Sequence, residues 1–419
     1  MGVAAFVLVA LTAVPYTKVI TAAFLPAIAF FFSIFLAVMF QARRENVKAM
    51  REIPEDLVMD RQDWLNLVII FVPITTILFL LLGNKDTVGN GILGSVLGSD
   101  SLILRTILNL TGDAISAGWL AVAVLVPLLF FDPMTRAKPS KVLVSLAQGG
   151  ILISRLFLLL FAVSIIAAFL TESGLTGELT RAVTSWLEKV AVLSLFGFEI
   201  PIVGGVYLML ALIYTMLCVI LLGMGMPTVP AYVNVALLLR PLLANLGVSF
   251  FTAHMFVFYF AVASAISPPV AVAAFAAASI TGAEPMRTGI STVRVGIVMF
   301  TIPFVFAWYP ELLLIEETVT ITNGSGQRTM IDGYSSQADW GQLSLLLARL
   351  ALALYLIASA LTRFDKTPMA NYEVALRFLA AVLLLWKTPA PLFAGLAFSA
   401  IILTMHYLKK DPRDETARA

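Results

Sequence analysis

The stretch that decides the fold reads Gly223-Met224-Gly225-Met226-Pro227-Thr228, between apolar runs at residues 201 to 222 and 229 to 241. Two glycines and a proline within five residues oppose a continuous helix. In a helix interior Gly costs about 1 kcal/mol and Pro about 3 kcal/mol relative to Ala. We therefore predict that the chain turns here, in a helical hairpin whose tip holds residues 224 to 228.

A second break follows. The apolar run at about residues 250 to 266 meets Ser267-Pro268-Pro269 before residues 270 to 283 continue. The two prolines donate no backbone hydrogen bond, so they free carbonyls of the preceding turn, and the half-helix after them presents the positive end of its dipole. This pattern predicts a broken helix.

Composition places both breaks in a membrane. Of the 419 residues, 60% are hydrophobic and 12% are charged, so polar side chains are too few to cover a soluble globule. The apolar residues form charge-free runs of about 18 to 25 residues, the length of a membrane-crossing helix, and the alternating segments of a membrane barrel are absent. We expect an all-α polytopic membrane protein with a re-entrant hairpin. The net charge of +2 gives no reason to expect nucleic-acid binding.

Broken backbone within hydrocarbon is tolerated only where it lines a cavity or binds an ion. Freed carbonyls with nearby hydroxyls offer the oxygen ligands of a hard monovalent cation, with Thr228, Ser264 and Ser267 as the Na⁺ candidates, and an anionic substrate can face the half-helix terminus. The candidate substrate- and ion-binding residues are Gly223, Met224, Gly225, Pro227, Thr228, Asn234, Ser264, Ser267, Pro268 and Pro269. Asn234 either donates to a bound carboxylate or caps the tip. The alternative is that both breaks are proline kinks packed against neighbouring helices.

The remaining apolar runs predict further membrane crossings at residues 17 to 40, 64 to 83, about 107 to 131, 142 to 171, 292 to 310, 341 to 361, 373 to 388 and 390 to 408. Lys and Arg concentrate in the connections 41 to 63 and 132 to 141, near residues 287 to 294 and 363 to 366, and in the carboxyl-terminal tail. These segments, the carboxyl terminus included, are therefore predicted to be cytoplasmic. Between them, residues 318 to 322 and 327 to 331 alternate around Asn323-Gly324-Ser325-Gly326, which predicts an extracytoplasmic β-hairpin.

Part of the sequence repeats. Val3-Ala4-Ala5-Phe6 recurs as Val272-Ala273-Ala274-Phe275, and Leu11-Thr12 as Ile280-Thr281. The predicted crossings place the two copies in opposite orientations, which is typical of an inverted-repeat transporter. The first copy lacks the lead-in of the second, so we expect an incomplete first repeat and a preceding half-helix and hairpin encoded upstream.

Around the two helix breaks the sequence resembles the large membrane subunit of tripartite ATP-independent periplasmic (TRAP) transporters. Within this family it resembles most the TAXI type, whose small and large membrane subunits are usually fused. The resemblance covers about residues 1 to 315, and the last three helices look like an extension found in some TAXI permeases. It rests on the segments 223–228, 231–232, 253–260, 264–270 and 273–275.

The resemblance implies an elevator-type secondary transporter of the bacterial or archaeal inner membrane. Such a permease takes an organic acid from a periplasmic solute-binding protein and is driven by Na⁺, with no other cofactor. Ser267 stands where the family pattern has threonine, which keeps the hydroxyl. The family's first hairpin and the small membrane subunit are not visible in this sequence.

No enzyme pattern competes with this interpretation. The sequence has no paired-histidine metal motif, no Gly-x-Ser-x-Gly and no phosphate loop, which favours a gradient over nucleotide as the energy source. We expect His254 to make an interfacial hydrogen bond and His406 to anchor its helix at the membrane interface. Two alternatives stay open: an ion-coupled anion carrier without a binding protein, and a non-transporting membrane scaffold.

These expectations divide the chain into seven parts: residues 1–16, the tail of the first-repeat broken helix; 17–171, scaffold and connecting helices; 172–291, the second-repeat transport region; 292–317, a membrane helix and its outer boundary; 318–340, the extracytoplasmic loop; 341–408, the carboxyl-terminal helices; and 409–419, the cytoplasmic tail.

Overall fold

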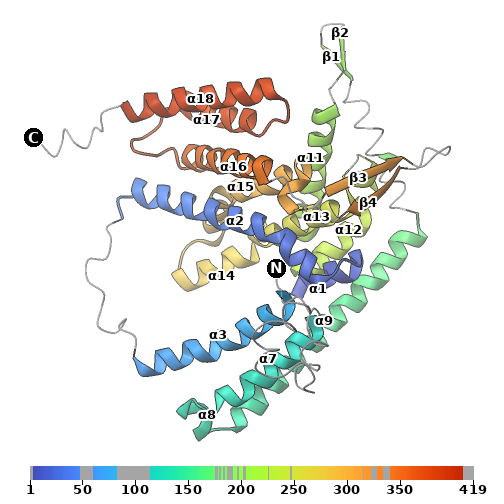
Figure 1. The fold of residues 1–419 in the computed structure, drawn as a ribbon, viewed down its shortest axis with the longest axis vertical. Helices are drawn as coiled ribbons and strands as arrows, with labels where there is room; N and C mark the ends of the chain where they lie inside the picture. The colour runs from blue at the N-terminus through green and yellow to red at the C-terminus, as the bar shows by residue number, and fades with distance from the viewer. Residues whose placement is uncertain are drawn as a thin grey trace, which may run out of the picture. The chain divides into compact units, whose positions relative to one another are not determined.

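The protein is helical, with two small β-hairpins (Figure 1). The computed structural model describes residues 3–47, 60–82, 114–174, 178, 181–182, 185, 192–195, 198–201, 204–224, 226–245, 248–314, 316–321, 328–333 and 340–408. The helices are α1 (Val3–Thr12), α2 (Tyr16–Arg44), α3 (Arg61–Leu82), α7 (Ala114–Leu129), α8 (Pro133–Ala137), α9 (Ser140–Glu172), α11 (Gly204–Gly223), α12 (Thr228–Asn245), α13 (Phe250–Ala263), α14 (Val272–Thr281), α15 (Pro285–Trp308), α16 (Trp340–Thr362), α17 (Asn371–Leu384) and α18 (Pro389–Leu408), with 3-10 turns η2 (Ser264–Ile266) and η3 (Pro310–Leu313).

The chain forms two compact units. One comprises residues 13–20 and 48–161, where α3 packs on α7 through buried Leu80 and Ala117. The other comprises residues 1–12, 21–47 and 162–419 and holds both predicted helix breaks. At the centre of this second unit lies α13, which packs on α11, α12 and α15. Apolar on all sides, α13 buries eleven of its fourteen residues, as expected of a core helix.

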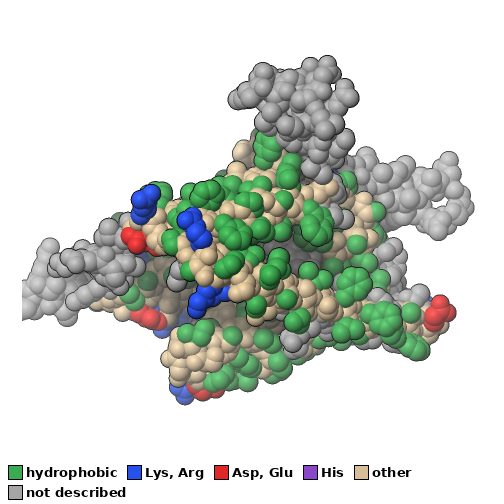
Figure 2. Space-filling model, turned by 90° about the horizontal axis from the view of Figure 1, so that it is seen from below, with side chains coloured by type: hydrophobic (Ala, Val, Ile, Leu, Met, Phe, Trp, Pro, Cys, Tyr) green, Lys and Arg blue, Asp and Glu red, His purple; other side chains and the backbone are tan. Residues whose placement is uncertain are grey.

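Several helices have the dimensions and surfaces of membrane spans. Among the described residues, α2, α3, α15, α16 and α18 are long and apolar enough to cross a bilayer. Large apolar side chains stand exposed on them, such as Phe31 of α2 at 70%. Figure 2 shows hydrophobic side chains over much of the visible surface and few charged ones. Because a water-facing surface rarely exposes such large apolar patches, these faces are adapted to lipid.

The predicted crossings at 17 to 40, 64 to 83, 292 to 310, 341 to 361 and 390 to 408 coincide with these five helices, which have the length and composition of membrane spans. The crossing predicted at 142 to 171 lies within α9, which has 33 residues. The prediction for 107 to 131 is described only from residue 114 onward, as α7. The crossing predicted at 373 to 388 is wrong in extent, because α17 has 14 residues and ends at Leu384.

The early end of α17 has a physical cause in α16. The guanidinium of Arg349 donates to the carbonyl of Leu384 at 2.7 and 2.9 Å and to that of Trp386 at 3.0 Å. Tyr309 donates to the carbonyl of Leu385 at 3.2 Å. These donors satisfy carbonyls that otherwise lack partners at a helix end. A glycine lets α18 approach, since a Cβ on Gly395 would lie 2.7 Å from the backbone nitrogen of Leu384.

A buried charged network joins the end of α16 to the start of α17 and the end of α18. Arg377, with no exposed surface, donates to Asp365 at 3.0 Å and to Ser359 at 2.5 Å, and its second terminal nitrogen lies 3.6 Å from Glu373. The Nδ1 atom of His406 lies 2.5 Å from the same Glu373 oxygen. The predicted interfacial anchoring of His406 is therefore wrong: its side chain is fully buried because Glu373 faces it from α17.

The hairpin predicted around residues 323 to 326 is confirmed by the antiparallel strands β3 (Glu316–Ile321) and β4 (Arg328–Gly333), which pair Thr318 with Ile331. Its turn lies outside the described residues. A second hairpin, of β1 (Val192–Leu195) and β2 (Phe198–Pro201), was not predicted. Its strands have four residues each, a length at which the alternation that marks a strand is too short to stand out from an apolar helix.

The repeated sequence has a repeated local structure. Both copies are ten-residue helices, α1 and α14, and each ends in a residue with left-handed backbone. These residues are Ala13, with φ 55°, and Gly282, with φ 70°, which occupy equivalent positions after Thr12 and Thr281. A long helix then begins, α2 in one copy and α15 in the other. The opposite membrane orientation of the two copies stays a prediction.

Replacing Arg377 by Met should destabilise the protein by about 3 to 5 kcal/mol, because it leaves Asp365 and Glu373 buried without their cation. Thermal unfolding of the purified chain in detergent measures the effect. The matched control is Arg287→Met, whose side chain is 91% exposed and should change stability by about 0.5 kcal/mol or less. Equal melting temperatures for the two variants would contradict the role of the network.

Candidate functional site

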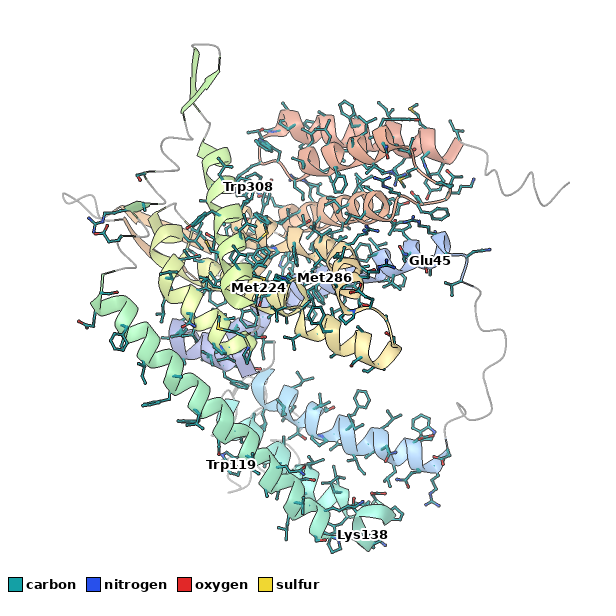
Figure 3. The ribbon with its side chains drawn as sticks, turned by 180° about the vertical axis from the view of Figure 1, so that it is seen from behind. Glu45, Trp119, Lys138, Met224, Met286 and Trp308 are labelled. Atoms are coloured by element: carbon teal, nitrogen blue, oxygen red, sulfur yellow. The ribbon has the colours of Figure 1, made fainter. Side chains whose placement is uncertain are left out.

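The first break separates α11 from α12. α11 ends at Gly223, where the carbonyl accepts a hydrogen bond from the Met226 N–H at 3.2 Å, and α12 begins at Thr228. Met224 marks the bend (Figure 3). The Pro227 carbonyl accepts from the Ala231 N–H at 3.2 Å and so starts the hydrogen-bond ladder of α12. The predicted interruption is thus present, while Gly225 lies outside the described residues.

The second break separates α13 from α14. The α-helix ends at Ala263, continues as the 3-10 turn η2, and opens at Ser267, whose backbone is extended with φ −97° and ψ 125°. Pro268 and Pro269 follow, joined by a cis peptide bond. Because neither proline has an N–H, the Ser264 carbonyl accepts from the Ser267 N–H at 3.2 Å instead. The sequence prediction of a broken helix is confirmed.

The two breaks meet at one point. The hydroxyl of Ser264 lies 3.2 Å from the carbonyl oxygen of Gly223 and 2.8 Å from that of Ala261. Ser264 is fully buried. A Cβ on Gly223 would lie 2.7 Å from the Ser264 hydroxyl oxygen and 2.9 Å from its Cβ, closer than real Cβ atoms approach. Only glycine lets the hairpin tip and the broken helix come this close.

A single hydroxyl proton cannot serve two carbonyls fully. When Ser264 donates to Ala261, its own lone pairs and the Gly223 carbonyl face each other as two acceptors. The neighbouring Ser267 hydroxyl, also buried, donates to the Ala263 carbonyl at 3.0 Å. The contact therefore gathers oxygen atoms from both breaks in a buried place, which is the arrangement that a hard cation uses.

Asn234 adds a buried oxygen. Its side-chain Oδ1 is buried and has no hydrogen-bond partner among the described residues. Asn234 follows Ala231 by three residues on α12, so the two share one face of the helix. Ala231 lies next to Gly223, because a Cβ added to Gly223 would be 3.3 Å from the Cβ of Ala231. A buried acceptor without a partner costs about 1 to 3 kcal/mol, so this position is destabilised unless something binds there.

The other predicted residues stand apart from this contact. Thr228 is half-buried, and its hydroxyl makes no hydrogen bond with any described residue. Met224 and Pro268 are half-buried, and Pro227 and Pro269 are exposed. The structure therefore brings Gly223 together with Ser264, and no hydrogen bond links Thr228 or Asn234 to that pair in the part of the chain that the structure describes.

His254 makes a hydrogen bond, as predicted. It is 2% exposed, and its Nδ1 atom lies 2.7 Å from the hydroxyl of Tyr232. The predicted hydrogen bond exists, and it is buried between α12 and α13. The cause is packing, because the ring of His254 lies against those of Tyr232 and Phe250. The bond ties the returning arm of the hairpin to the helix before the second break.

Two glycines of α15 were missed by the sequence analysis. A Cβ on Gly289 would lie 3.3 Å from Pro268, and one on Gly296 would lie 3.0 Å from Ile266. Seven residues apart, the two glycines share one face of α15 and make room for the second break. Their spacing in the sequence was an available signal of close helix packing.

The half-helix after the second break begins without a side-chain cap. Its N-cap residue is Ala271, whose side chain accepts no hydrogen bond from the first turn of α14. The first N–H groups of a helix point along its axis and carry a partial positive charge, which attracts anions. The site thus combines an oxygen-rich contact with an uncapped helix terminus.

Together, the lipid-adapted helices, the interrupted hairpin and the broken helix define a multi-pass helical membrane protein of the transporter class. The comparison with known families identifies the group: the family described as the tripartite ATP-independent periplasmic transporter, DctM component, matches residues 1–321. The chain belongs to this family and is a membrane permease component of a TRAP transporter. No curated protein and no solved structure matches the chain.

Replacing Gly223 by Ala should destabilise the protein, because the new methyl group overlaps Ser264. The double variant Gly223→Ala/Ser264→Gly should recover much of the loss, since it removes the atoms that clash. Thermal unfolding in detergent compares the two. Gly149→Ala on α9, where a Cβ meets nothing within 4 Å, should instead raise stability by about 0.5 to 1 kcal/mol. Equal effects at the two glycines would refute the close contact.

Proposed function

We propose that this permease couples the uptake of an organic (carboxylic) acid to a Na⁺ gradient and receives its substrate from a periplasmic solute-binding protein. The observation that carries the proposal is the buried contact of Ser264 with the Gly223 carbonyl, which brings two interrupted helices to one point. A small membrane subunit and the cytoplasmic (inner) membrane location belong to the same proposal. They are supported by membership of the TRAP transporter family.

Sodium is the proposed coupling ion because the groups at the contact are neutral oxygens. The Gly223 carbonyl, the hydroxyls of Ser264 and Ser267, and the orphan Oδ1 of Asn234 offer acceptors without a carboxylate. Neutral oxygens suit a hard cation of low charge, whereas divalent cations usually take carboxylates. A bound Na⁺ would relieve the facing acceptors and thereby favour one arrangement of the two breaks.

An organic acid is the proposed substrate because its carboxylate complements the uncapped terminus of α14. Ion and substrate would then bind on the two sides of Ser267-Pro268-Pro269. Each would stabilise the same local arrangement, and two ligands that favour one conformation bind cooperatively. This linkage is how a gradient of one solute drives the movement of another.

Sodium should raise the melting temperature of the purified chain relative to K⁺ at equal ionic strength, because a ligand that binds only the folded state stabilises it. Asn234→Leu tests the site with opposite signs: it should raise stability in K⁺, since it removes a buried unpaired oxygen, and abolish the response to Na⁺. The control is Ser154→Ala, which removes an exposed serine hydroxyl bonded to the Gly150 carbonyl and should keep the response. A Na⁺ response that survives in Asn234→Leu would exclude Asn234 as a ligand.

Uptake of labelled organic acid into proteoliposomes tests coupling directly. The permease, its small membrane subunit and its binding protein should together give uptake that requires an inward Na⁺ gradient. Ser264→Ala should lower this uptake by about tenfold or more, because it removes a cation ligand worth about 1.5 to 3 kcal/mol. Uptake that is independent of the binding protein would favour an anion carrier of another kind. A chain with neither uptake nor Na⁺ response would act as a scaffold.

A further inference from the structure

A cavity of about 450 Å³ gathers three arginines, from α2, from α15 and from the residue after α16. Arg44 ends α2, Arg294 lies on α15, and Arg363 follows the last residue of α16. Its other described lining residues are Ala360, Leu361, Val374 and Phe378. None of these residues is acidic, so the three positive charges face the cavity without a carboxylate there. Exposed like charges repel one another only weakly, whereas an anion bound among them would be attracted by all three.

The arginines are available for an anion. No ion pair involves them in the part of the chain that the structure describes, and all three are exposed. Arg44 donates one hydrogen bond, at 3.1 Å, to the Thr362 carbonyl at the end of α16, which holds its guanidinium beside the cavity. Guanidinium groups bind phosphate through pairs of parallel hydrogen bonds, so three of them suit a phosphate group.

Arg363 occupies a position that favours glycine. Its φ is 54°, and the helix ends with Arg363 N–H bonded to the Ala360 carbonyl at 3.1 Å and Phe364 N–H to the Ser359 carbonyl at 3.2 Å. This is the Schellman ending of a helix, in which the left-handed residue is usually Gly. Arginine is less favourable than glycine in this backbone conformation, although its charge suits a helix C-terminus, and its side chain lines the cavity.

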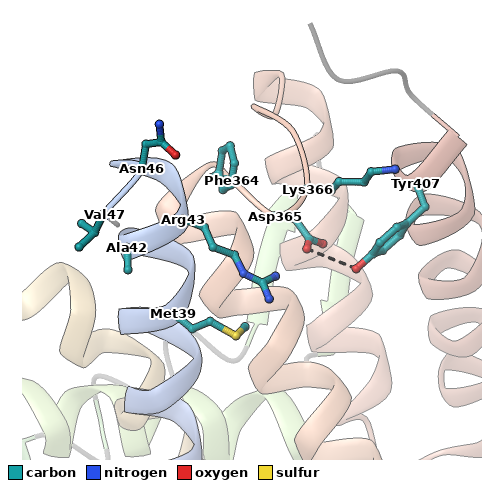
Figure 4. A pocket seen from close by; sticks show the side chains of 9 residues that line it. All are labelled: Met39, Ala42, Arg43, Asn46, Val47, Phe364, Asp365, Lys366 and Tyr407. Carbon is teal, nitrogen blue, oxygen red and sulfur yellow. Dashed lines mark hydrogen bonds between the residues drawn. The ribbon is translucent and has the colours of Figure 1, made fainter. Parts of the chain in front are cut away.

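A neighbouring cavity serves as a contrast. It has about 550 Å³ and is lined by Arg43 and Lys366, but also by Asp365 (Figure 4). Asp365 is bonded to Tyr407 and Arg377, and its carboxylate places negative charge at the cavity wall. The positive charges are thus partly balanced in this cavity and unbalanced in the first.

Apolar side chains lead away from the three arginines along α17. Val374, Phe378 and Val382 follow at intervals of four residues and therefore share one face of the helix. Phe378 is 36% exposed and Val382 is 51% exposed. A free phosphate would not use this surface, whereas the acyl chains of a lipid would lie on it.

We propose that the cavity of Arg44, Arg294 and Arg363 binds the phosphate headgroup of an anionic membrane phospholipid, with its acyl chain along Val374, Phe378 and Val382. All three arginines come from segments that the charge pattern predicts to be cytoplasmic, so the lipid would belong to that leaflet. The lipid joins the family-matched helices α2 and α15 to α16 and α17, which lie beyond the match.

The test compares melting temperatures of the full chain in detergent with added phosphatidylglycerol, phosphatidylcholine or inorganic phosphate. Phosphatidylglycerol should raise the melting temperature, and the other two should not. Arg294→Gln should weaken the apparent affinity for phosphatidylglycerol by about tenfold, the loss of one charged hydrogen-bonding partner. The matched control is Arg287→Gln on the same helix, which lies outside the cavity and should keep the response.

Arg363→Gly separates binding from folding. Glycine suits the left-handed position, so this variant should melt at an equal or higher temperature without lipid and still lose the response to phosphatidylglycerol. An equal rise with inorganic phosphate would replace the lipid by a free anion. An equal rise with phosphatidylcholine, a loss of response in Arg287→Gln, or an unchanged response in Arg363→Gly would overturn the proposal.

Discussion

The arrangement of the two helix breaks depends on one close approach, that of Gly223 to Ser264. The absence of a side chain at Gly223 lets the end of α11 reach the end of α13, and the serine hydroxyl then lies 3.2 Å from a backbone carbonyl across the gap. Both helices are interrupted at this point for local reasons, through Pro227 on one side and Pro268 and Pro269 on the other. The contact therefore brings the two helix breaks together at one point.

The surroundings hold this contact in place. The Tyr232 to His254 bond joins α12 to α13, and Gly289 and Gly296 of α15 make room for Pro268 and Ile266 of the second break. Buried polar groups are favourable only when they are paired, and most of those around the contact are. The Oδ1 of Asn234 differs, because it is buried and has no hydrogen-bond partner among the described residues, which is why we propose it as an ion ligand.

The features that were predictable from sequence are those with local causes. Proline and glycine act on their own backbone, so both helix breaks could be located to within a few residues. The hairpin of β3 and β4 depends on alternation on either side of a Gly-rich turn, which is also local. The ten-residue helices α1 and α14 follow from nearly the same short sequence and end in left-handed residues at equivalent positions.

The features that were missed depend on partners far apart in the chain. His406 is buried because Glu373, 33 residues away in the sequence, faces it, and the sequence around His406 does not indicate this partner. The end of α17 is set by Arg349, a residue of another helix, where the apolar sequence itself continues past Leu384. The Gly223 to Ser264 contact spans 41 residues, so the sequence supplied both groups as candidates but not their meeting.

The helices beyond residue 321 are more than an appendage to the family-matched part. The buried network of Arg377, Asp365 and Glu373 fixes the start of α17 against the end of α16. Arg44 of α2 then bonds to the last carbonyl of α16, which attaches this fixed corner to the family-matched helices. Two of the three cavity arginines come from the matched part and the third from the extension, so the cavity exists only where the two are joined. A charged ligand at that place would respond to any relative movement of α2 and α16, because such movement changes the distances among like charges.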